Sequence, residues 1–281
     1  MFFILCLFFV LFSFISMVTN NIVVYWSLFL MMTLLFIMLN KEMGGYVSNF
    51  NYFVIQEVLG LIFLIFSSSF LVFFIILMKI GVAPLHFWIF SITNNMSNLS
   101  LIWFLVFQKV PAFFILMQNF YNYIYFLMFG LLFCYMQLYL MKGQKNMMII
   151  SSTESFNWMI IGFMFTFFSP IFLFIYYCLL MLFLLPKVTE NQYLDLNMKT
   201  ILVFLNTPFS VVFFVKVFSL IEILFNENYL FILVLMFSMS LSIFSIGYWL
   251  VNYSLKDNYF NSNVNYLFFM SLFSMMLFSA I

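Results

Sequence analysis

Long runs without a charged residue constrain this chain more than any other feature. The first forty residues contain no Asp, Glu, Lys or Arg, and further uncharged runs cover 110–141, 155–186 and 228–255. The hydrocarbon core of a bilayer takes about 20 helical residues, so each run is long enough for one or two membrane-spanning helices. The runs lack the alternation of a transmembrane strand. They therefore predict an all-α polytopic membrane protein.

Composition excludes several other classes of protein. Of the 281 residues, 67% are hydrophobic and 6% are charged, whereas a soluble domain carries about 25% charged residues because its surface faces water. A nucleic-acid-binding protein needs a basic face, and this sequence has none, so we expect no nucleic-acid partner. The cysteines Cys6, Cys134 and Cys178 are scattered singly, which argues against a disulfide framework and against a zinc or iron–sulfur site.

A bias in residue usage points to an organelle genome. The sequence has no arginine and three alanines, but it has 47 Phe. Arg and Ala have G/C-rich codons and Phe has A/T-rich codons, so this usage is typical of an extremely A/T-biased gene. The uncharged N-terminus resembles neither a secretory nor a transit peptide. We therefore expect synthesis inside the organelle.

Chain length bounds the number of spans. With about 20 residues per helix and short loops, a chain of 281 residues holds roughly 11 helices. Polar breaks such as Thr19-Asn20-Asn21 and the Gly44-Gly45 pair divide the sequence accordingly. We predict one membrane domain, 1–281, with helices near 2–18, 22–40, 52–66, 70–90, 99–121, 123–141, 146–168, 170–187, 198–225, 229–252 and 263–280.

Three lysines inside predicted spans carry the most information about function. Lys79 and Lys109 lie near the middle of their spans, and Lys216 lies further along its span. An ionisable group at the bilayer centre costs about 2.5–3.5 kcal/mol, so three lysines cost on the order of 8–10 kcal/mol. Buried charge at this cost is typical of an ion or proton pathway. The alternative is a lysine near a helix end, with its stem in lipid and its ammonium in water.

Two prolines interrupt predicted spans. Pro84 lacks the N–H that would bond the carbonyl of Ile80, and Pro208 likewise frees the carbonyl of Phe204. Both helices should therefore break, in the fourth and the ninth span by our count. Breaks at corresponding places in two halves of a membrane chain indicate an inverted-repeat transporter.

One stretch of the sequence resembles a known family. Residues 78–88 read MKIGVAPLHFW, and the pair Gln108-Lys109 follows, with Lys109 thirty residues after Lys79. This pattern is similar to subunit 2 of mitochondrial NADH:ubiquinone oxidoreductase, respiratory complex I, and weaker similarity extends over about 20–250. Short loops and the absence of arginine suggest a nematode-like lineage. The resemblance implies an antiporter-like fold, with inverted five-helix repeats at about 2–121 and 123–252 and a last helix at about 263–280.

The same resemblance implies a function and partners. Members of this family pass protons along lysines and acids at mid-membrane depth, in the membrane arm of complex I in the mitochondrial inner membrane. The expected activity is that of a subunit of the H⁺-translocating NADH:ubiquinone reductase. Flavin, iron–sulfur clusters and quinone are expected in partner subunits, with no cofactor and no redox site in this chain. The implied partners are other membrane-arm subunits, namely NADH dehydrogenase subunits 4 and 4L, nuclear-encoded accessory subunits, and lipids.

Carried over by position, Lys79 matches the lysine of the first broken helix, Lys109 that of the next helix, and Lys216 that of the second broken helix. One departure from the family matters. The family usually has a glutamate four residues after the tryptophan of the second helix, whereas here Trp26 is followed by Leu30. A counter-charge about 4 Å away is worth about 4 kcal/mol at an effective dielectric constant of about 20. Without one, a desolvated lysine tends to lose its proton.

Two acids are candidates for a replacement role. Glu57, on the predicted third helix, lies nearest along the chain, and we hypothesise that it substitutes for the lost partner of Lys79; the alternative is a position close to the membrane face. Ser151-x-x-Glu154 is typical of a capping box at a helix start. The resemblance instead puts Glu154 inside the seventh helix, the repeat-related counterpart of the helix that lost its glutamate. We favour the cap.

His86 and Glu222 are further candidates for a relay. His86 follows Lys79 by seven residues, and its ordinary pKa of about 6.5 suits a proton shuttle. A lone histidine is more often a hydrogen-bonded structural residue. Glu222, six residues past Lys216, resembles a family acid but also fits an interfacial charge.

Three functions are consistent with the sequence. The first is a proton relay within complex I. The second is a passive structural scaffold in the same membrane arm, which the loss of the glutamate at Leu30 favours. The third is a free-standing cation/proton antiporter, which should carry a pair of acids at its ion site. No two acids lie close together within one predicted span.

Overall fold

The computed structural model of the chain describes residues 2–40, 46–66, 69–94, 96, 98–118, 123–141, 144–165, 171, 174, 175, 177, 178, 211–225 and 229–254. Within these ranges the secondary structure is helical and contains no strand, which confirms the all-helical prediction. The chain divides into two compact units, residues 1–123 and residues 124–281. The boundary falls close to the end of the first predicted repeat, while the inverted relation between the repeats stays a prediction.

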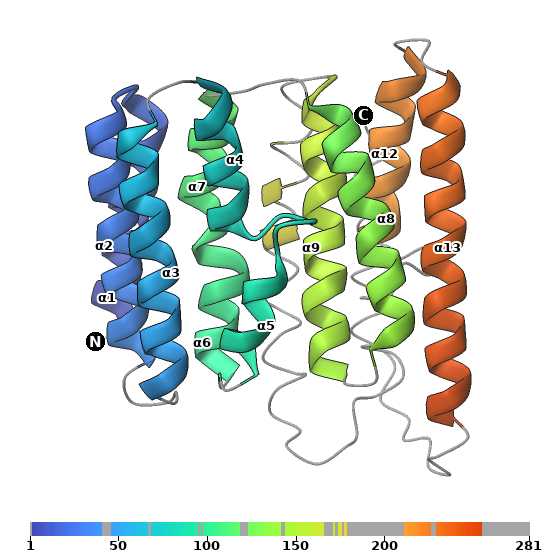
Figure 1. The fold of residues 1–281 in the computed structure, drawn as a ribbon, viewed down its shortest axis with the longest axis horizontal. Helices are drawn as coiled ribbons and strands as arrows, with labels where there is room; N and C mark the ends of the chain where they lie inside the picture. The colour runs from blue at the N-terminus through green and yellow to red at the C-terminus, as the bar shows by residue number, and fades with distance from the viewer. Residues whose placement is uncertain are drawn as a thin grey trace. The chain divides into compact units, whose positions relative to one another are not determined.

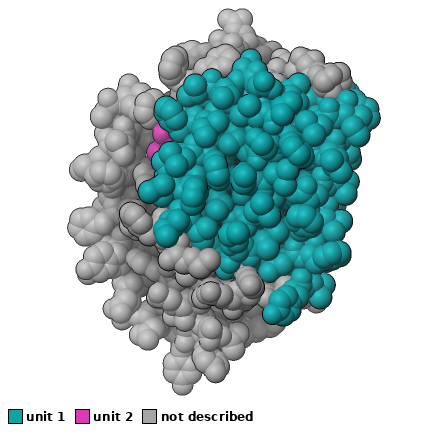
Figure 2. Space-filling model, turned by 90° about the vertical axis from the view of Figure 1, so that its left-hand side faces the viewer, with its two compact units in different colours: residues 1–123 teal, residues 124–281 magenta. Residues whose placement is uncertain are grey.

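Unit 1 is a bundle of helices around a central break. Helix α1 packs against α2 and α7, and α3 packs against α2, α4 and α5 (Figure 1). Figure 2 shows this unit in teal as one contiguous body. Its elements are α1 (Phe2–Val18), α2 (Ile22–Asn40), α3 (Tyr46–Ile65), α4 (Ser69–Ile80), α5 (Phe87–Thr93), α6 (Asn98–Ile102), the π-helix η1 (Trp103–Phe107) and α7 (Lys109–Gln118).

Polar side chains satisfy the backbone at the ends of the first helices. The side-chain oxygen of Asn21 accepts a hydrogen bond from the Val23 N–H at 3.0 Å, as expected at a helix N-terminus. The Tyr25 hydroxyl is hydrogen-bonded to Gln118 of α7, and Gln118 donates to the carbonyl of Met17 at 2.8 Å. The uncharged N-terminal run therefore divides into two helices where polar groups bridge to α7.

The third helix begins earlier than its predicted start near residue 52. Helix α3 starts at Tyr46, because the polar residues that suggested a connection are satisfied by contacts inside the unit. Asn40 at the end of α2 is hydrogen-bonded to the side chain of Asn49, and Asn49 also donates to the carbonyl of Asn40 at 3.4 Å. The polar start of this segment is therefore compatible with a longer helix.

Unit 2 contains four described helices: α8 (Ile124–Leu140), α9 (Gln144–Phe163), α12 (Val211–Phe225) and α13 (Tyr229–Ser254). Helix α9 packs against α8 and α12, and α13 packs against α8 and α12 (Figure 1). The predicted break at Pro208 and the predicted helix 263–280 lie outside the described residues.

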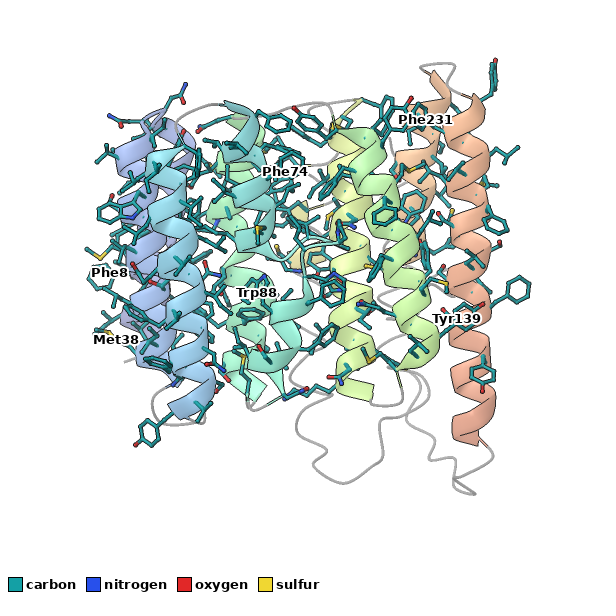
Figure 3. All side chains as sticks on the ribbon, viewed as in Figure 1. Phe8, Met38, Phe74, Trp88, Tyr139 and Phe231 are labelled. Carbon is teal, nitrogen blue, oxygen red and sulfur yellow. The ribbon has the colours of Figure 1, made fainter. Side chains whose placement is uncertain are left out.

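Several helices have the length and composition of membrane spans. Three described helices are long and apolar enough to cross a bilayer, namely Ile22–Asn40, Tyr46–Ile65 and Ser100–Gln118. Shorter apolar helices cover Ile4–Val18, Phe70–Ile80, Ile124–Leu140 and Phe231–Ser245. Large apolar side chains such as Phe8 and Met38 project from the outer faces of α1 and α2 (Figure 3). These features are those of a membrane protein.

The predicted break in the fourth span is confirmed. Helix α4 ends at Ile80, an irregular segment that contains Pro84 follows, and α5 begins at Phe87. Gly81 has a φ of +75°, and a Cβ at this position would lie 2.2 Å from the side chain of Ile89. A side chain is unfavourable at this position, because the backbone is in the left-handed region and the Ile89 side chain would have to move.

The predicted helix over 99–121 contains a π turn that the sequence analysis did not anticipate. The N–H of Gln108 donates to the carbonyl of Trp103, five residues back, at 3.1 Å. Pro111 has no N–H for the carbonyl of Phe107, and the π turn lies directly before this point. Pro111 is therefore the sequence signal that could have indicated the irregularity. The turn places Lys109 at the start of α7.

Candidate functional site

The three lysines selected on the cost of burial are all buried. Lys79 in the last turn of α4 is 7% exposed, Lys109 at the start of α7 is 3% exposed, and Lys216 in α12 is 0% exposed. Their side chains therefore lie within the helical units rather than on the apolar outer faces. This burial is the property that the proton-pathway interpretation requires, whereas the lipid-stem alternative requires exposed ammonium groups.

Lys79 is held by a carbonyl and an aromatic ring. Its Nζ donates to the backbone carbonyl of Gln56 on α3 at 3.3 Å, and it lies 4.3 Å from the centre of the Phe29 ring on α2. No carboxylate of the described residues forms an ion pair with it. A desolvated ammonium over an aromatic face gains about 2 kcal/mol. These contacts offset part of the cost of burying the ammonium, but they do not neutralise its charge.

Side chains of two neighbouring helices satisfy the broken end of α4. The amide of Gln56 on α3 donates to the carbonyl of Lys79 at 3.4 Å, and Trp88 Nε1 on α5 donates to the carbonyl of Met78 at 3.0 Å. Figure 3 labels Trp88 at this break. The Met78 carbonyl also accepts a hydrogen bond from the Gly81 N–H at 3.1 Å, so Trp88 supplies a second donor there. The same residues that repair the break therefore fix the position of Lys79.

Glu57 takes a secondary position at this site. It follows Gln56 on α3 and is half-buried, and successive helical residues point about 100° apart, so the two side chains face different directions. Glu57 attracts Lys79 electrostatically, but the two form no ion pair. Its role as a replacement for the missing glutamate stays a prediction.

A polar row on α3 connects the surroundings of two lysines. Tyr52 lies one helical turn before Gln56, and its hydroxyl accepts a hydrogen bond from the side-chain amide of Gln108. Gln108 directly precedes Lys109, and Gln56 contacts Lys79. The sequence analysis assigned no role to Tyr52, although its four-residue spacing from Gln56 was a usable signal.

The structure places His86 at the helix break of unit 1 and Glu222 on α12. His86 is fully buried directly before α5, and its ring stacks on Phe87 with centroids 5.2 Å apart. Because the helix breaks at Gly81, His86 is not two helical turns from Lys79 on a continuous helix. Glu222 lies on α12, and its side chain is outside the described residues.

Unit 2 contains a buried ion pair. Lys216 of α12 donates to the carboxylate of Glu154 on α9, and both side chains are 0% exposed. The capping-box prediction for Glu154 was wrong, because α9 begins at Gln144, so Ser151 lies well inside the helix. The Ser151 hydroxyl donates instead to the carbonyl of Met148 at 2.9 Å. The seventh-helix placement that the resemblance implied is the correct one.

Two aromatic residues line this pair. The Lys216 ammonium lies 5.8 Å from the ring centres of both Tyr135 on α8 and Trp158 on α9. Trp158 Nε1 donates to the Tyr135 hydroxyl at 3.1 Å, and that hydroxyl also has hydrogen-bond contacts with Glu154 and with Ser238 on α13. The sequence analysis did not assign a role to Tyr135, because it lies in an apolar run with no motif around it.

The hydroxyl groups near Glu154 bond mainly to their own helix. Four of them donate to the carbonyl three residues earlier at 2.7–3.0 Å, namely Ser151, Ser152, Thr153 and Ser155. This pattern satisfies buried hydroxyls mainly through their own helix, and Thr153 also lies 3.7 Å from the Cys134 sulfur on α8. The described residues include no group of three His, Cys, Asp or Glu side chains that could hold a metal ion. The chemistry that the Lys216 ammonium and the Glu154 carboxylate can carry out is the gain and loss of protons.

Comparison with known proteins gives close relatives over nearly the whole chain. The sequence is 53% identical over 268 residues to "NADH-ubiquinone oxidoreductase chain 2" of Caenorhabditis elegans, covering 95% of each chain. It is 46% identical over 278 residues to the protein of the same name from Ascaris suum, covering 98% of this chain and 92% of the relative. A protein of this name from Artemia franciscana is 40% identical over 111 residues, 38% of this chain and 36% of its own. No protein-family model matches the sequence.

Proposed function

Because the chain belongs to the NADH-ubiquinone oxidoreductase chain 2 family, we propose that it is a membrane-arm subunit of respiratory complex I that relays protons through buried lysines. The observation that supports this most is the fully buried Lys216–Glu154 pair, together with the burial of Lys79 and Lys109. Ionisable groups inside membrane helices are costly and typically belong to ion pathways. A proton relay explains why these buried ionisable groups are present.

The proposal extends to architecture and surroundings. The chain forms about eleven spans in the mitochondrial inner membrane, as two inverted repeats and a last helix. Its partners are NADH dehydrogenase subunits 4 and 4L, accessory subunits and lipids. Flavin, iron–sulfur clusters and quinone belong to other subunits, so redox chemistry takes place there and this chain contributes proton transfer. The break after α4, and the break predicted at Pro208, would provide polar backbone in the middle of the membrane.

The mechanism is an electrostatic relay. A lysine whose neighbouring negative charge is removed releases its proton to a chain of water molecules, and it is recharged from the other side when that charge returns. At Lys216 the neighbouring negative charge is Glu154. A change in the charge or position of Glu154 would therefore couple this site to the rest of the complex. At Lys79 the described residues that act on the ammonium are the Gln56 carbonyl, the Phe29 ring and the more distant Glu57. This site therefore responds to weaker changes in the surrounding field.

The scaffold alternative rests on one specific observation. Lys79 has no ion-pair partner among the described residues, and Leu30 stands where the family usually has a glutamate. A scaffold would need buried lysines only for packing. It would then tolerate Lys216→Met and Lys79→Met without loss of proton translocation, provided that the complex still assembles.

Lysine replacement in the assembled complex tests the proposal. We expect Lys216→Met and Lys79→Met to lower the number of protons translocated per NADH oxidised in sealed vesicles, with the complex assembled as judged on native gels. Lys145→Met is the matched control, because Lys145 lies at the start of α9 and is half-buried. Unchanged translocation in both test variants would contradict the relay and support the scaffold.

A further inference from the structure

The side chain of Tyr135 contacts the buried ion pair from a third helix. Tyr135 is fully buried on α8, whereas Glu154 belongs to α9 and Lys216 to α12. Its hydroxyl contacts Glu154, and its ring lies 5.8 Å from the Lys216 ammonium. One side chain therefore contacts both the negative and the positive member of the pair.

The hydrogen bonds around this hydroxyl determine where its proton points. Trp158 Nε1 donates to the Tyr135 oxygen at 3.1 Å, so this oxygen acts as an acceptor toward Trp158. The Ser238 hydroxyl donates to the carbonyl of Leu235 at 2.7 Å, so its proton is not available to Tyr135. The Tyr135 O–H therefore has two acceptors in contact, the Glu154 carboxylate and the Ser238 oxygen. The charged acceptor gives the stronger bond.

We propose that Tyr135 is a positioning residue that keeps Glu154 ionised beside Lys216, by donating its hydroxyl proton to the carboxylate. In an apolar interior, a lysine–glutamate pair can become neutral when the proton of the ammonium moves to the carboxylate. Such a transfer would block the relay at this site, because the proton of Lys216 would pass to Glu154 and not to the water chain. A donor to the carboxylate opposes this transfer. Tyr135 keeps its own proton throughout.

Several described groups near Glu154 have hydrogen-bond partners of their own. Lys216 is the cation itself, and Trp158 donates its N–H to Tyr135. Cys134, next to Tyr135 on α8, has its sulfur 3.7 Å from the Thr153 hydroxyl. The hydroxyls of Ser151 and Ser155 donate to backbone carbonyls. The inference rests on the proposed function, because it assigns a role within the same relay.

The experiment compares Tyr135→Phe with Tyr139→Phe in the assembled complex. Both changes remove one hydroxyl from α8, but Tyr139 is exposed one turn further along the helix. A hydrogen bond to a charged group is worth about 1.5–3 kcal/mol, so we expect Tyr135→Phe to slow proton translocation at least about tenfold. Tyr139→Phe should translocate protons at the native rate. Native translocation in Tyr135→Phe would overturn the inference.

Infrared difference spectroscopy gives a readout that a purely structural role would not change. Tyr135→Phe should produce the carbonyl stretch of a protonated carboxyl group, and this band should be missing from Tyr135→Phe/Glu154→Gln. In the Glu154→Gln background, Tyr135→Phe should cause no additional loss of translocation. An equal loss in both backgrounds, or a spectrum without the band, would overturn the assignment of Tyr135.

Two further outcomes separate the inference from the proposed function. If Glu154→Gln itself translocates protons normally, the pair has no part in a relay, and the proposed function fails at this site. If Glu154→Gln is impaired but Tyr135→Phe is normal, only the role of Tyr135 fails. Should Tyr135→Phe not assemble, assembly of Tyr135→Phe/Glu154→Leu/Lys216→Met supports the inference, because no charged pair is left to position. Failure of this triple variant to assemble counts against it.

Discussion

Lys79 in unit 1 and Lys216 in unit 2 are buried in different ways. Lys216 forms an ion pair with Glu154, whereas Lys79 is bonded to the Gln56 carbonyl and lies over the Phe29 ring. A unit counter-charge about 4 Å away is worth about 4 kcal/mol at an effective dielectric constant of about 20. A bond to an ammonium and a desolvated cation–π contact are each worth about 2 kcal/mol. The two arrangements are thus comparable in strength, but only the first neutralises the charge.

This difference indicates how each site can respond. The pair in unit 2 resists change until Glu154 is neutralised or moves, because the carboxylate supplies most of the stabilisation. No carboxylate of the described residues is paired with Lys79, so a protonated Lys79 leaves a net positive charge at the site in unit 1. The energy of that charge depends more strongly on charges elsewhere in the complex. Leu30 stands where the family usually has a glutamate. Lys79 nevertheless keeps a stabilising contact, its hydrogen bond to the Gln56 carbonyl.

The largest expected effect comes from separating the ion pair. Glu154→Leu should destabilise the subunit by about 3–5 kcal/mol, because Lys216 is left charged among apolar groups. Adding Lys216→Met should recover most of this stability, although proton translocation stays lost. The yield of assembled complex on native gels and its thermal inactivation temperature measure both effects. A double variant as unstable as Glu154→Leu would show that the pair is not the cause.

The helix break of unit 1 should be nearly as sensitive to a side chain at Gly81. Gly81→Ala should cost about 1–3 kcal/mol or more, because the residue has a φ of +75° and its Cβ would meet Ile89. Gly247→Ala on α13 is the matched control, since nothing lies within 4 Å of the added methyl. It should stabilise the helix by about 0.5–1 kcal/mol. Thermal inactivation of the complex distinguishes the two; equal effects would contradict the local geometry.

The aromatic contact of Lys79 should appear as a coupling energy. In a double-mutant cycle, Phe29→Leu and Lys79→Met should couple by about 1–2 kcal/mol, because the ring acts on the ammonium. Phe36→Leu, two turns along the same helix, packs on Tyr52 and Phe104 and serves as the control. Its coupling with Lys79→Met should be close to zero. Similar coupling in both cycles would mean that packing, not charge, is measured.

The smallest effect is expected from Glu57. Glu57→Gln removes a charge that attracts Lys79 without an ion pair. We therefore expect the protonated form of Lys79 to lose about 1 kcal/mol of electrostatic stabilisation. The number of protons translocated per NADH should fall modestly. Glu154→Gln, measured in parallel, should lower the ratio further. An unchanged ratio in Glu57→Gln would defeat the hypothesis that it replaces the missing glutamate.

Local sequence patterns predicted the elements whose causes are local. The uncharged runs gave helices with nearly the observed bounds for α1 and α2, Pro84 gave the break after α4, and the cost of charge selected Lys79, Lys109 and Lys216. Each of these follows from residues within a few positions of one another. The π turn before α7 was missed because Pro111 signals an irregularity but not its type.

Contacts between distant helices could not be predicted in the same way. Glu154 and Lys216 are 62 positions apart, and only the packing of α9 on α12 brings them together. The S-x-x-E pattern was misread as a helix start because it is equally compatible with a helix interior, where serine bonds to its own backbone. Tyr135 gave no signal, since a tyrosine in an apolar run is typical of packing.

A side-chain-resolution map of the intact particle tests the central claim most directly, by showing whether ordered water connects the buried lysines. We predict water molecules between Lys79, Lys109 and Lys216, with the ammonium groups inside the protein. Lysines that point to lipid headgroups, with a dry gap from each one to the next, would contradict a proton relay in this chain.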